Sequence, residues 1–278
     1  TRADDTQQGG GGGRFQRVGP FSFVSNDTKQ FAEWGFDYLK YDWNPIDVPN
    51  TKIAYDLMRA SGRDIVFSLS NSARLNDAAG LAQYSQLWRT SGDMSDTWGA
   101  IRQNAFDKAA WAPFQGPGHW ADEDMLVVGR VSVGEELHPT RLTPNEQVLH
   151  ITQWCLLASP LLIGCDLAAL DPFTLSLLTN DEVLDVDQDP LGKMGQPVRR
   201  EDTREVWSKP LEDGSVDVGL YNLGEDPQTI RVDWKELGLA PGNYRVRDLW
   251  RQKDVARSTE GYRAKVGRHG AALLRIFR

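Results

Sequence analysis

The sequence feature that most constrains the fold is the segment WGFDYLKYDWN, which begins at Trp34. Its hydrophobic positions predict a short buried strand over residues 36–42 that ends on Asp42, with Lys40 just before it. A strand that stops on an acid followed by Trp43 places a carboxylate beside an aromatic ring at the rim of a sheet. In α/β barrels the active site lies at this rim, where the carboxyl ends of the strands meet. The segment therefore predicts that Asp42 belongs to a functional site.

Strands and helices alternate along the following part of the chain. Hydrophobic runs predict further strands near residues 64–70, 86–90, 120–128 and 160–165. Helical patterns lie before, between and after them, near residues 26–34, 53–61, 75–85, 95–110, 143–157 and 175–178. Alternation at this spacing is typical of parallel βα units. Five such units fit within residues 21–195, whereas a closed barrel needs eight. Either the sheet is open, or the chain is the C-terminal part of a longer protein.

The two ends of the chain differ in texture from this α/β region. The run Gly9–Gly13 predicts a flexible lead-in. After about Pro197, short hydrophobic runs are separated by turn signals such as Asp213-Gly214, which predicts a small antiparallel β domain. We therefore expect a Gly-rich lead-in over residues 1–20, a partial (β/α)8 TIM-barrel-type catalytic domain over 21–197, and an antiparallel β-sandwich domain over 198–278.

The composition argues against several classes of protein. A net charge of −8 and a pI near 5.1 disfavour a nucleic-acid-binding protein, which usually has a basic face. No apolar run reaches the roughly 18 residues that a membrane span needs, and no signal peptide is visible. Cys155 and Cys165 lie in apolar surroundings and predict buried thiols instead of a disulfide framework. The histidines are scattered and predict structural roles: His119, His138, His150 and His269.

Acidic residues recur at the ends of the predicted strands. They are Asp42, Asp93 with Asp96, Asp122 with Asp124, and Asp166. A lone strand-end Asp is more often a helix cap than a catalyst. Here, however, successive strand ends carry acids, and three have an adjacent tryptophan: Trp43, Trp98 and Trp120. Paired carboxylates in an aromatic-walled pocket perform glycoside hydrolysis, in which one attacks the sugar or stabilises its charge and the other protonates the leaving oxygen.

Two other interpretations stay open on the residues alone. The carboxylates of Asp42, Asp93, Asp122 and Asp124 are also the oxygen ligands that a divalent ion would need in a metal-dependent barrel enzyme. Alternatively, the chain is a non-catalytic carbohydrate-binding fragment. No Gly-rich phosphate loop follows a strand, no Gly-x-Ser-x-Gly elbow occurs, and no His pair has zinc spacing. For the glycoside hydrolase interpretation we expect no cofactor and no metal.

Five motifs, in order along the chain, resemble those of a known family. They are LKYD ending at Asp42, LWRTSGDMSDTW over residues 87–98, GPGHWADEDMLV over 116–127, SPLLIGCDL over 159–167 and DQDPLG over 187–192. Together they resemble the α-galactosidase family of retaining glycoside hydrolases (family 27), and the bacterial members are most similar. The resemblance implies a (β/α)8 barrel followed by an antiparallel β domain, and hydrolysis of terminal α-linked galactose from galactosides. It also implies a secreted or periplasmic location.

The same resemblance implies a double-displacement mechanism with two carboxylates. Asp42 matches the nucleophile that forms the covalent galactosyl-enzyme, and Asp93 matches the acid/base that protonates the leaving oxygen and then activates water. Retention requires the two carboxyl groups to lie roughly 5–5.5 Å apart. Lys40 and Arg89 match cations that contact the substrate. The other substrate-binding residues that we expect are Trp43, Ser70, Ala73, Trp120, Asp124 and Met125.

Departures from the family pattern affect this expected site. The segment Ala121–Asp124 reads ADED where the family usually has NDPD, which is expected to loosen the loop. Ser70 and Ala73 fall where α-galactosidases tend to carry Glu and Leu. The α-N-acetylgalactosaminidase branch has small residues there, so an acetamido group would fit.

The largest departure is at the start of the chain. The first three βα units of the family supply an aromatic wall and an Asp pair that bind galactose O4 and O6, and nothing in residues 1–20 resembles them. We expect an α-galactosidase acting on carbohydrate. An α-N-acetylgalactosaminidase and a truncated, inactive or carbohydrate-binding fragment are the alternatives. No nucleic-acid or membrane partner is expected, and a homo-oligomer is left open.

Overall fold

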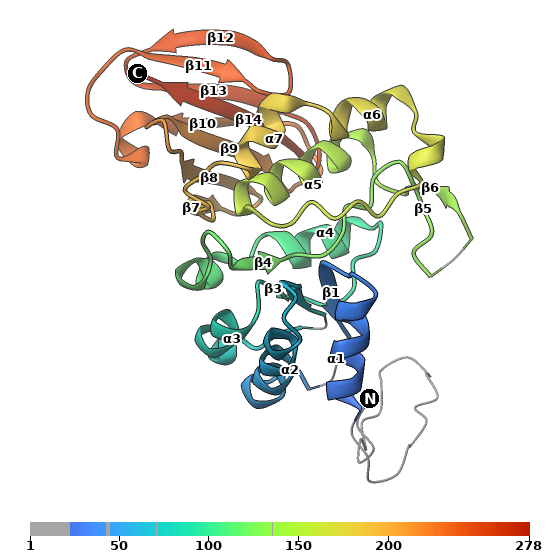
Figure 1. Ribbon diagram of the computed structural model, residues 1–278. Helices are drawn as coiled ribbons and strands as arrows, with labels where there is room; N and C mark the ends of the chain where they lie inside the picture. Colours follow the sequence, from blue (N-terminus) through green and yellow to red (C-terminus); the bar gives the residue numbers. More distant parts are fainter. Residues whose placement is uncertain (1–22, 43–44, 71, 135) are drawn as a thin grey trace. The chain divides into compact units, whose positions relative to one another are not determined.

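The computed structural model describes residues 23–42, 45–70, 72–134 and 136–278 (Figure 1). The chain forms two compact units, one ending at Gly92 and the other covering Asp93–Arg278. The expected lead-in over residues 1–20 and the expected substrate-binding residue Trp43 lie outside the described residues.

The first unit consists of βα elements in the predicted order. They are α1 (Val24–Glu33), β1 (Tyr38–Tyr41), α2 (Val48–Ala60), β2 (Val66–Leu69), the 3₁₀ turn η1 (Leu75–Asp77), α3 (Ala78–Tyr84) and β3 (Leu87–Arg89). β1 pairs with β2, and β2 with β3, in parallel. The side chains of Phe67, Leu69 and Trp88 are fully buried, which explains why these short hydrophobic runs form strands. The parallel βα arrangement predicted from the sequence is confirmed here.

The second unit begins with helices and short strands. They are α4 (Trp98–Ala105), the 3₁₀ helix η2 (Ala109–Phe114), β4 (Trp120–Asp122), the pair β5 (Arg130–Val131) and β6 (His138–Pro139), α5 (Pro144–Leu157), η3 (Leu167–Ala169), α6 (Pro172–Leu178) and α7 (Asp181–Asp187). α5 starts at the predicted capping box, where Glu146 N–H donates to Thr143 Oγ1 and Thr143 N–H donates to Glu146 Oε2. From Glu146 onward α5 is buried on nearly all sides, so it is the central helix of this unit.

Two predicted strands are shorter than their hydrophobic runs. β4 ends at Asp122, because Asp124 has a φ of 77° and a left-handed residue interrupts a strand. The run 160–165 forms only isolated bridges, from Ile163 to Leu126 and from Cys165 to Val131. Pro160 has no N–H with which to extend this pairing.

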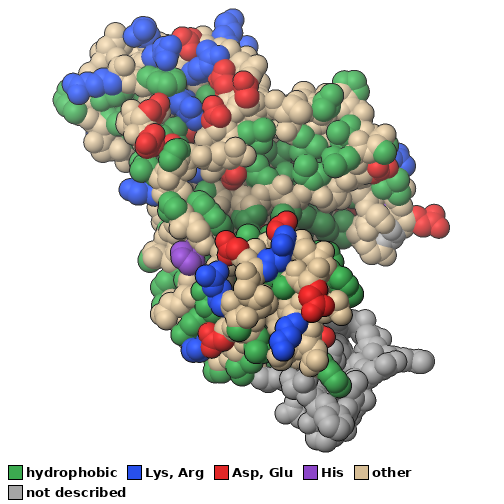
Figure 2. All heavy atoms as spheres, in the orientation of Figure 1, with side chains coloured by type: hydrophobic (Ala, Val, Ile, Leu, Met, Phe, Trp, Pro, Cys, Tyr) green, Lys and Arg blue, Asp and Glu red, His purple; other side chains and the backbone are tan. Residues whose placement is uncertain are grey.

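The rest of the second unit is an antiparallel β-sandwich. Its strands are β7 (Gln196–Glu201), β8 (Arg204–Pro210), β9 (Val216–Asn222), β10 (Gln228–Asp233), β11 (Tyr244–Asp248), β12 (Lys253–Ser258), β13 (Gly261–Val266) and β14 (Gly270–Phe277). One sheet has the order β12-β11-β14-β9-β8-β7, and β10 pairs with β13 in the other. A core that includes Val218, Leu220, Val232 and Val246 fills the space between them. In Figure 2, Lys, Arg, Asp and Glu side chains gather on this sandwich, whereas hydrophobic side chains form a broad patch in the region of α6.

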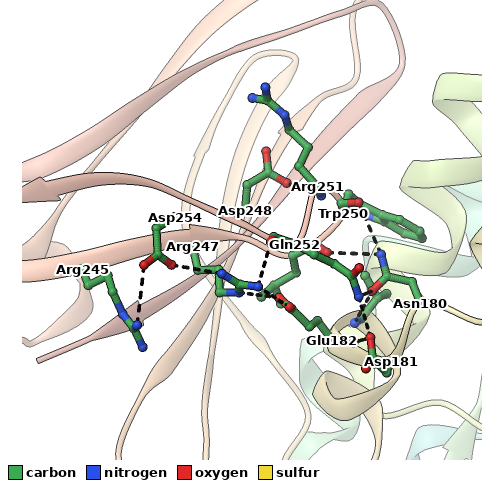
Figure 3. A network of polar contacts seen from close by, with 12 residues as sticks. Asn180, Asp181, Glu182, Arg245, Arg247, Asp248, Trp250, Arg251, Gln252 and Asp254 are labelled. Atoms are coloured by element: carbon green, nitrogen blue, oxygen red, sulfur yellow. Dashed lines mark hydrogen bonds and ion pairs between the residues drawn. The ribbon is translucent and has the colours of Figure 1, made fainter.

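Helix α7, which the sequence analysis missed, is tied to the sandwich through its N-terminal turn (Figure 3). Arg247 of β11 binds Glu182 through two nitrogens, at 2.7 and 2.5 Å. Gln252 Nε2 donates to Asp181 Oδ1 at 2.5 Å. The helix-capping Asn180 donates its Nδ2 to Leu249 O at 3.2 Å. A paired, two-point Arg–carboxylate contact is more specific than an ordinary surface ion pair. These contacts fix α7 against the β11–β12 hairpin.

Within the described ranges, no helix is both long and apolar enough to cross a membrane.

The last residue of α7, Asp187, faces a buried lysine. Lys209 of β8 is fully buried, and its Nζ donates to Cys155 O at 3.2 Å and to Val186 O. Burial raises the pKa of the Asp187 carboxyl from 3.8 to about 7, and the nearby Lys209 ammonium only partly opposes this. Asp187 Oδ1 accepts no hydrogen bond from the described residues.

We expect Asp187→Asn to stabilise the protein at pH 8 and to have little effect at pH 4. Because the folded-state pKa of this acid is raised, its stability contribution is complete below 3.8 and is lost as the pH rises through about 7. Lys209 loses a counter-charge in the variant, so we expect a gain of about 1–2 kcal/mol, less than the full pKa shift would give. Urea unfolding at both pH values measures it. The exposed Asp185 of the same helix gives the control Asp185→Asn. An Asp187→Asn variant destabilised equally at both pH values would contradict the expectation.

Candidate active site

The expected site residues are divided between the two units. The first unit holds Lys40, Asp42, Ser70, Ala73 and Arg89, and the second holds Asp93, Trp120, Asp124 and Met125. Each set is described within its own unit.

Asp42 lies directly after β1, at the carboxyl edge of the parallel strands. Tyr41 pairs with Leu69, and Leu69 with Trp88, so β1, β2 and β3 end at the same edge. Ser70 N–H donates to Tyr41 O at 3.0 Å, which places Ser70 beside the start of the Asp42 segment. Lys40 and Asp42 are both exposed and two positions apart, so along an extended chain they face the same side. The first unit thus presents a cation and a carboxylate on one face of the strand end.

Two small, buried side chains follow β2, and the last residue of β3 is also buried. Ser70 and Ala73 are buried, and Ala73 N–H donates to the backbone oxygen of Arg89 at 2.7 Å. Arg89 is itself 2% exposed, and its guanidinium donates to Ser91 O at 3.2 Å. The backbone of residue 73 is therefore fixed to the end of β3. Small side chains at 70 and 73 leave more space at this edge than Glu and Leu would.

In the second unit, the exposed Asp93 begins a segment that is anchored at several points. Met94 N–H donates to Asp124 Oδ2 at 2.5 Å. Asp96 is fully buried and accepts hydrogen bonds from the Arg141 backbone N–H at 2.8 Å, from its guanidinium at 3.0 Å, and lies 3.2 Å from His138 Nε2. Buried carboxylates with several donors hold a backbone rigidly. The segment that carries Asp93 is therefore well positioned.

The same segment is also held by the sandwich. Thr97 caps α4 by accepting from Ala100 N–H at 3.3 Å. The next residue, Trp98, stacks on the His269 ring at 4.0 Å between ring centres, with 13° between the ring planes. His269 precedes β14, so the β-sandwich contributes directly to the support of the Asp93 segment.

The loop from Ala121 to Asp124 is buried and hydrogen-bonded, so the expected loosening is not seen. Glu123 N–H donates to Ser159 Oγ at 3.0 Å, and Glu123 Oε2 lies 3.5 Å from Lys108 Nζ in a buried ion pair. Asp124 N–H donates to Asp122 Oδ1 at 2.7 Å. These contacts replace the stiffening that a proline at position 123 would give.

Trp120 and Met125 each lie against a glycine of another motif. A Cβ on Gly192 would come within 2.7 Å of Trp120 Cη2, and one on Gly164 would come within 2.7 Å of Met125 Sδ. Larger residues would displace these side chains, so the glycines of the SPLLIGCDL and DQDPLG motifs shape the surroundings of Trp120 and Met125.

Sequence analysis predicted structural roles for His138 and His269, did not single out Arg141, and connected none of the three with this half of the site. His138, Arg141 and His269 act through Asp96 and Trp98, and only their tertiary contacts reveal them. His150 is a core residue: Val127 N–H donates to its Nε2 at 3.2 Å, and burial lowers its pKa to about 3. Among the described residues, no three or more His, Cys, Asp or Glu side chains are grouped to hold a metal ion.

Two protein-family descriptions match consecutive parts of the chain. "Alpha galactosidase A" matches residues 12–189, and "Alpha galactosidase C-terminal beta sandwich domain" matches residues 201–276. The chain belongs to the α-galactosidase family. Its α/β region is therefore an incomplete TIM-type barrel, and the antiparallel domain that follows is the β-sandwich of this family.

Individual family members agree with this assignment. α-Galactosidase 2 of Arabidopsis thaliana is 38% identical over 237 residues, which cover 84% of this chain and 58% of that protein. Human α-galactosidase A is 32% identical, with 79% and 53% covered. A solved structure of a family 27 β-L-arabinopyranosidase from Geobacillus stearothermophilus is 30% identical, has a TM-score of 0.85, and is matched over 92% of this chain and 61% of that one. The chain thus spans somewhat more than half the length of these relatives.

Proposed function

We propose that the chain carries the catalytic carboxylates of a retaining glycosidase that removes terminal α-linked galactose. The observation that carries this proposal is the exposed Asp42 directly after β1, two positions from the exposed Lys40. Family membership supports it, because relatives such as those of Arabidopsis and human are named α-galactosidases. The separately anchored Asp93 supplies the second carboxylate that the reaction requires.

The proposed reaction has two displacements at the anomeric carbon. In the first, a carboxylate oxygen of Asp42 attacks this carbon while Asp93 protonates the glycosidic oxygen, so the bond to the aglycone breaks and an ester to Asp42 forms. In the second, the ionised Asp93 takes a proton from water, the water oxygen attacks the anomeric carbon, and the ester bond breaks. Two inversions give net retention. Lys40, on the face of β1 that carries Asp42, would stabilise the Asp42 carboxylate and contact the sugar.

A second substrate class is favoured by the small, buried side chains of Ser70 and Ala73. If this edge faces the sugar 2-position, an acetamido group fits where Glu and Leu would exclude it, and the enzyme is an α-N-acetylgalactosaminidase. The Geobacillus relative suggests a third substrate for comparison. β-L-Arabinopyranose has the ring configuration of galactose without the hydroxymethyl group, so it tests how much the C6 contacts matter.

A side-by-side assay on the three nitrophenyl glycosides tests the proposed function. We expect turnover of the α-galactoside by a version of the chain joined to the first barrel units of the Geobacillus enzyme, and weaker turnover by the chain alone. The reason is that family 27 relatives are longer, and aromatic side chains such as Trp34 and Tyr38 are exposed on the first unit. Preference for the N-acetylgalactosaminide would select the second class. Binding of galactose without turnover by either form would leave the carbohydrate-binding alternative.

A further inference from the structure

Asp124 is held through its backbone N–H, its backbone carbonyl and its side chain. Its N–H donates to Asp122 Oδ1 at 2.7 Å, its carbonyl oxygen accepts from Trp154 Nε1 at 2.7 Å, and its Oδ2 accepts from Met94 N–H at 2.5 Å. The residue is 4% exposed and has a φ of 77°. A left-handed conformation is unfavourable for a residue with a Cβ and persists only where surrounding contacts enforce it. Such enforced geometry points to a specific task for the carboxylate.

The bond to Met94 defines that task. The Met94 N–H belongs to the peptide group that joins Asp93 to Met94, so the position of this hydrogen fixes the backbone torsion on the carboxyl side of Asp93. Asp93 is exposed, whereas Met94 is buried. The bond to Asp124 therefore sets the direction in which the Asp93 side chain leaves the protein surface.

The loop that carries Asp124 is supported by the contacts of its neighbour Glu123. Glu123 and Lys108 form a buried ion pair at 3.5 Å, with side-chain exposures of 0% and 8%. Glu123 N–H is bound to Ser159 Oγ, and Asn104 Nδ2 lies 3.5 Å from Glu123 O. The ion pair holds the Glu123 side chain, and these two hydrogen bonds hold its backbone. This support keeps the neighbouring Asp124 carboxylate directed at the Met94 amide.

We infer that Asp124 is a positioning residue for the acid/base Asp93, acting through the Met94 amide, with the Lys108–Glu123 pair as its support. The inference rests on the proposed glycosidase function and deepens it. If the acid is misplaced, the rate of cleavage falls most for substrates whose leaving group must be protonated. A poor leaving group such as a sugar alcohol needs the proton, whereas dinitrophenolate leaves without it.

The test compares Asp124→Gly with Asp124→Asn in the completed chain, which is the chain joined to the first barrel units of the Geobacillus enzyme. Glycine accepts a φ of 77° without strain, so Asp124→Gly removes the whole side chain, including the carboxylate, without straining the backbone. We expect kcat/KM on melibiose to fall about 10- to 100-fold, with less than about a threefold change for dinitrophenyl α-galactoside at the galactosyl-transfer step. Asp124→Asn keeps an oxygen acceptor and should recover most of the loss. Asp202, also left-handed but in the exposed β7–β8 turn, gives the matched control Asp202→Gly, which should behave like the wild type.

A double-mutant comparison tests whether Asp124 acts through Asp93, and an exchange measurement tests whether Asp124 holds the Met94 amide. If Asp124 acts through Asp93, Asp124→Gly should cost nothing further on melibiose in an Asp93→Ala background. Amide hydrogen exchange over residues 90–98 should become roughly tenfold faster at Met94 in Asp124→Gly and stay unchanged in Asp202→Gly. Equal losses on both substrates, or unchanged Met94 exchange, would overturn the inference. A completed chain that is inactive on every glycoside would instead remove the proposed function, while the exchange measurement would still decide whether Asp124 holds the Asp93 peptide.

Discussion

Asp42→Ala is expected to lower the turnover of nitrophenyl α-galactoside by on the order of 10⁴-fold or more, because the variant has no oxygen with which to form the covalent intermediate. Asp42 follows β1 and is exposed, so truncating it leaves no cavity in the core. The fold should therefore survive, which circular dichroism and urea unfolding can check. The exposed Asp56 of α2 gives the control Asp56→Ala. Its partner is the exposed Lys52, and such a pair contributes little to stability.

Added azide distinguishes loss of the nucleophile from general damage. Azide can enter the space that the Asp42 carboxylate leaves and attack the anomeric carbon directly. This single displacement inverts the configuration, so an α-galactoside should give β-galactosyl azide, which proton NMR identifies. Asp56→Ala should show no acceleration by azide. Full activity of Asp42→Ala without azide would remove Asp42 from the mechanism, and with it the proposed assignment of β1 as the nucleophile strand.

The strand that carries Asp42 could be predicted because its signal is local. The hydrophobic residues up to Tyr41 and the acid after them are contiguous in the sequence, and β1 forms within the predicted range. The prediction that this strand is buried was wrong, because Tyr38 and Lys40 are exposed and Leu39 and Tyr41 are only half-buried. The start of α5 was predictable for the same reason, since the Thr143–Glu146 capping box closes within one turn. Such elements depend on contacts between near neighbours.

Elements stabilised by distant residues were missed. α7 is a short, acidic helix, and its contacts come from Arg247 and Gln252, far away in the sequence. The strands β7 and β12, at the edges of the large sheet, are also polar and exposed along much of their length. Such elements lack the periodic hydrophobic residues from which helices and strands are predicted.

The roles of the loop carboxylates illustrate the same limit. The sequence places Asp124 in a family motif, from which a contact with sugar was expected. Its hydrogen bond with the Met94 amide joins residues 30 positions apart, and the neighbouring residues do not predict its left-handed conformation. Likewise, Arg141 and His138 contact Asp96 across more than 40 residues. Tertiary contacts of this kind join residues far apart in the sequence, so a local pattern does not predict them.

Asp93→Ala is expected to have an effect that depends on the leaving group. On melibiose, kcat/KM should fall about 10²- to 10⁴-fold, because no acid protonates the departing oxygen. On dinitrophenyl α-galactoside the first step needs no proton, so the galactosyl–Asp42 ester should form rapidly and accumulate, since no base activates water for the second step. A burst of dinitrophenolate followed by slow turnover, together with a lowered KM, measures this accumulation.

Azide should again give a distinct outcome, because it needs no base to attack the accumulated ester. The second displacement then yields α-galactosyl azide, with retained configuration, in contrast to the β-product expected of Asp42→Ala. Asp107, whose side chain is 87% exposed and whose partner is Arg200 at 3.4 Å, gives the control Asp107→Ala, which should show neither a burst nor azide acceleration. If Asp93→Ala loses the same factor on both leaving groups, Asp93 is not the acid/base. Opposite anomers from the two variants would assign the first displacement to Asp42 and the assistance of the second to Asp93, since each azide product records which displacement the missing carboxylate performs.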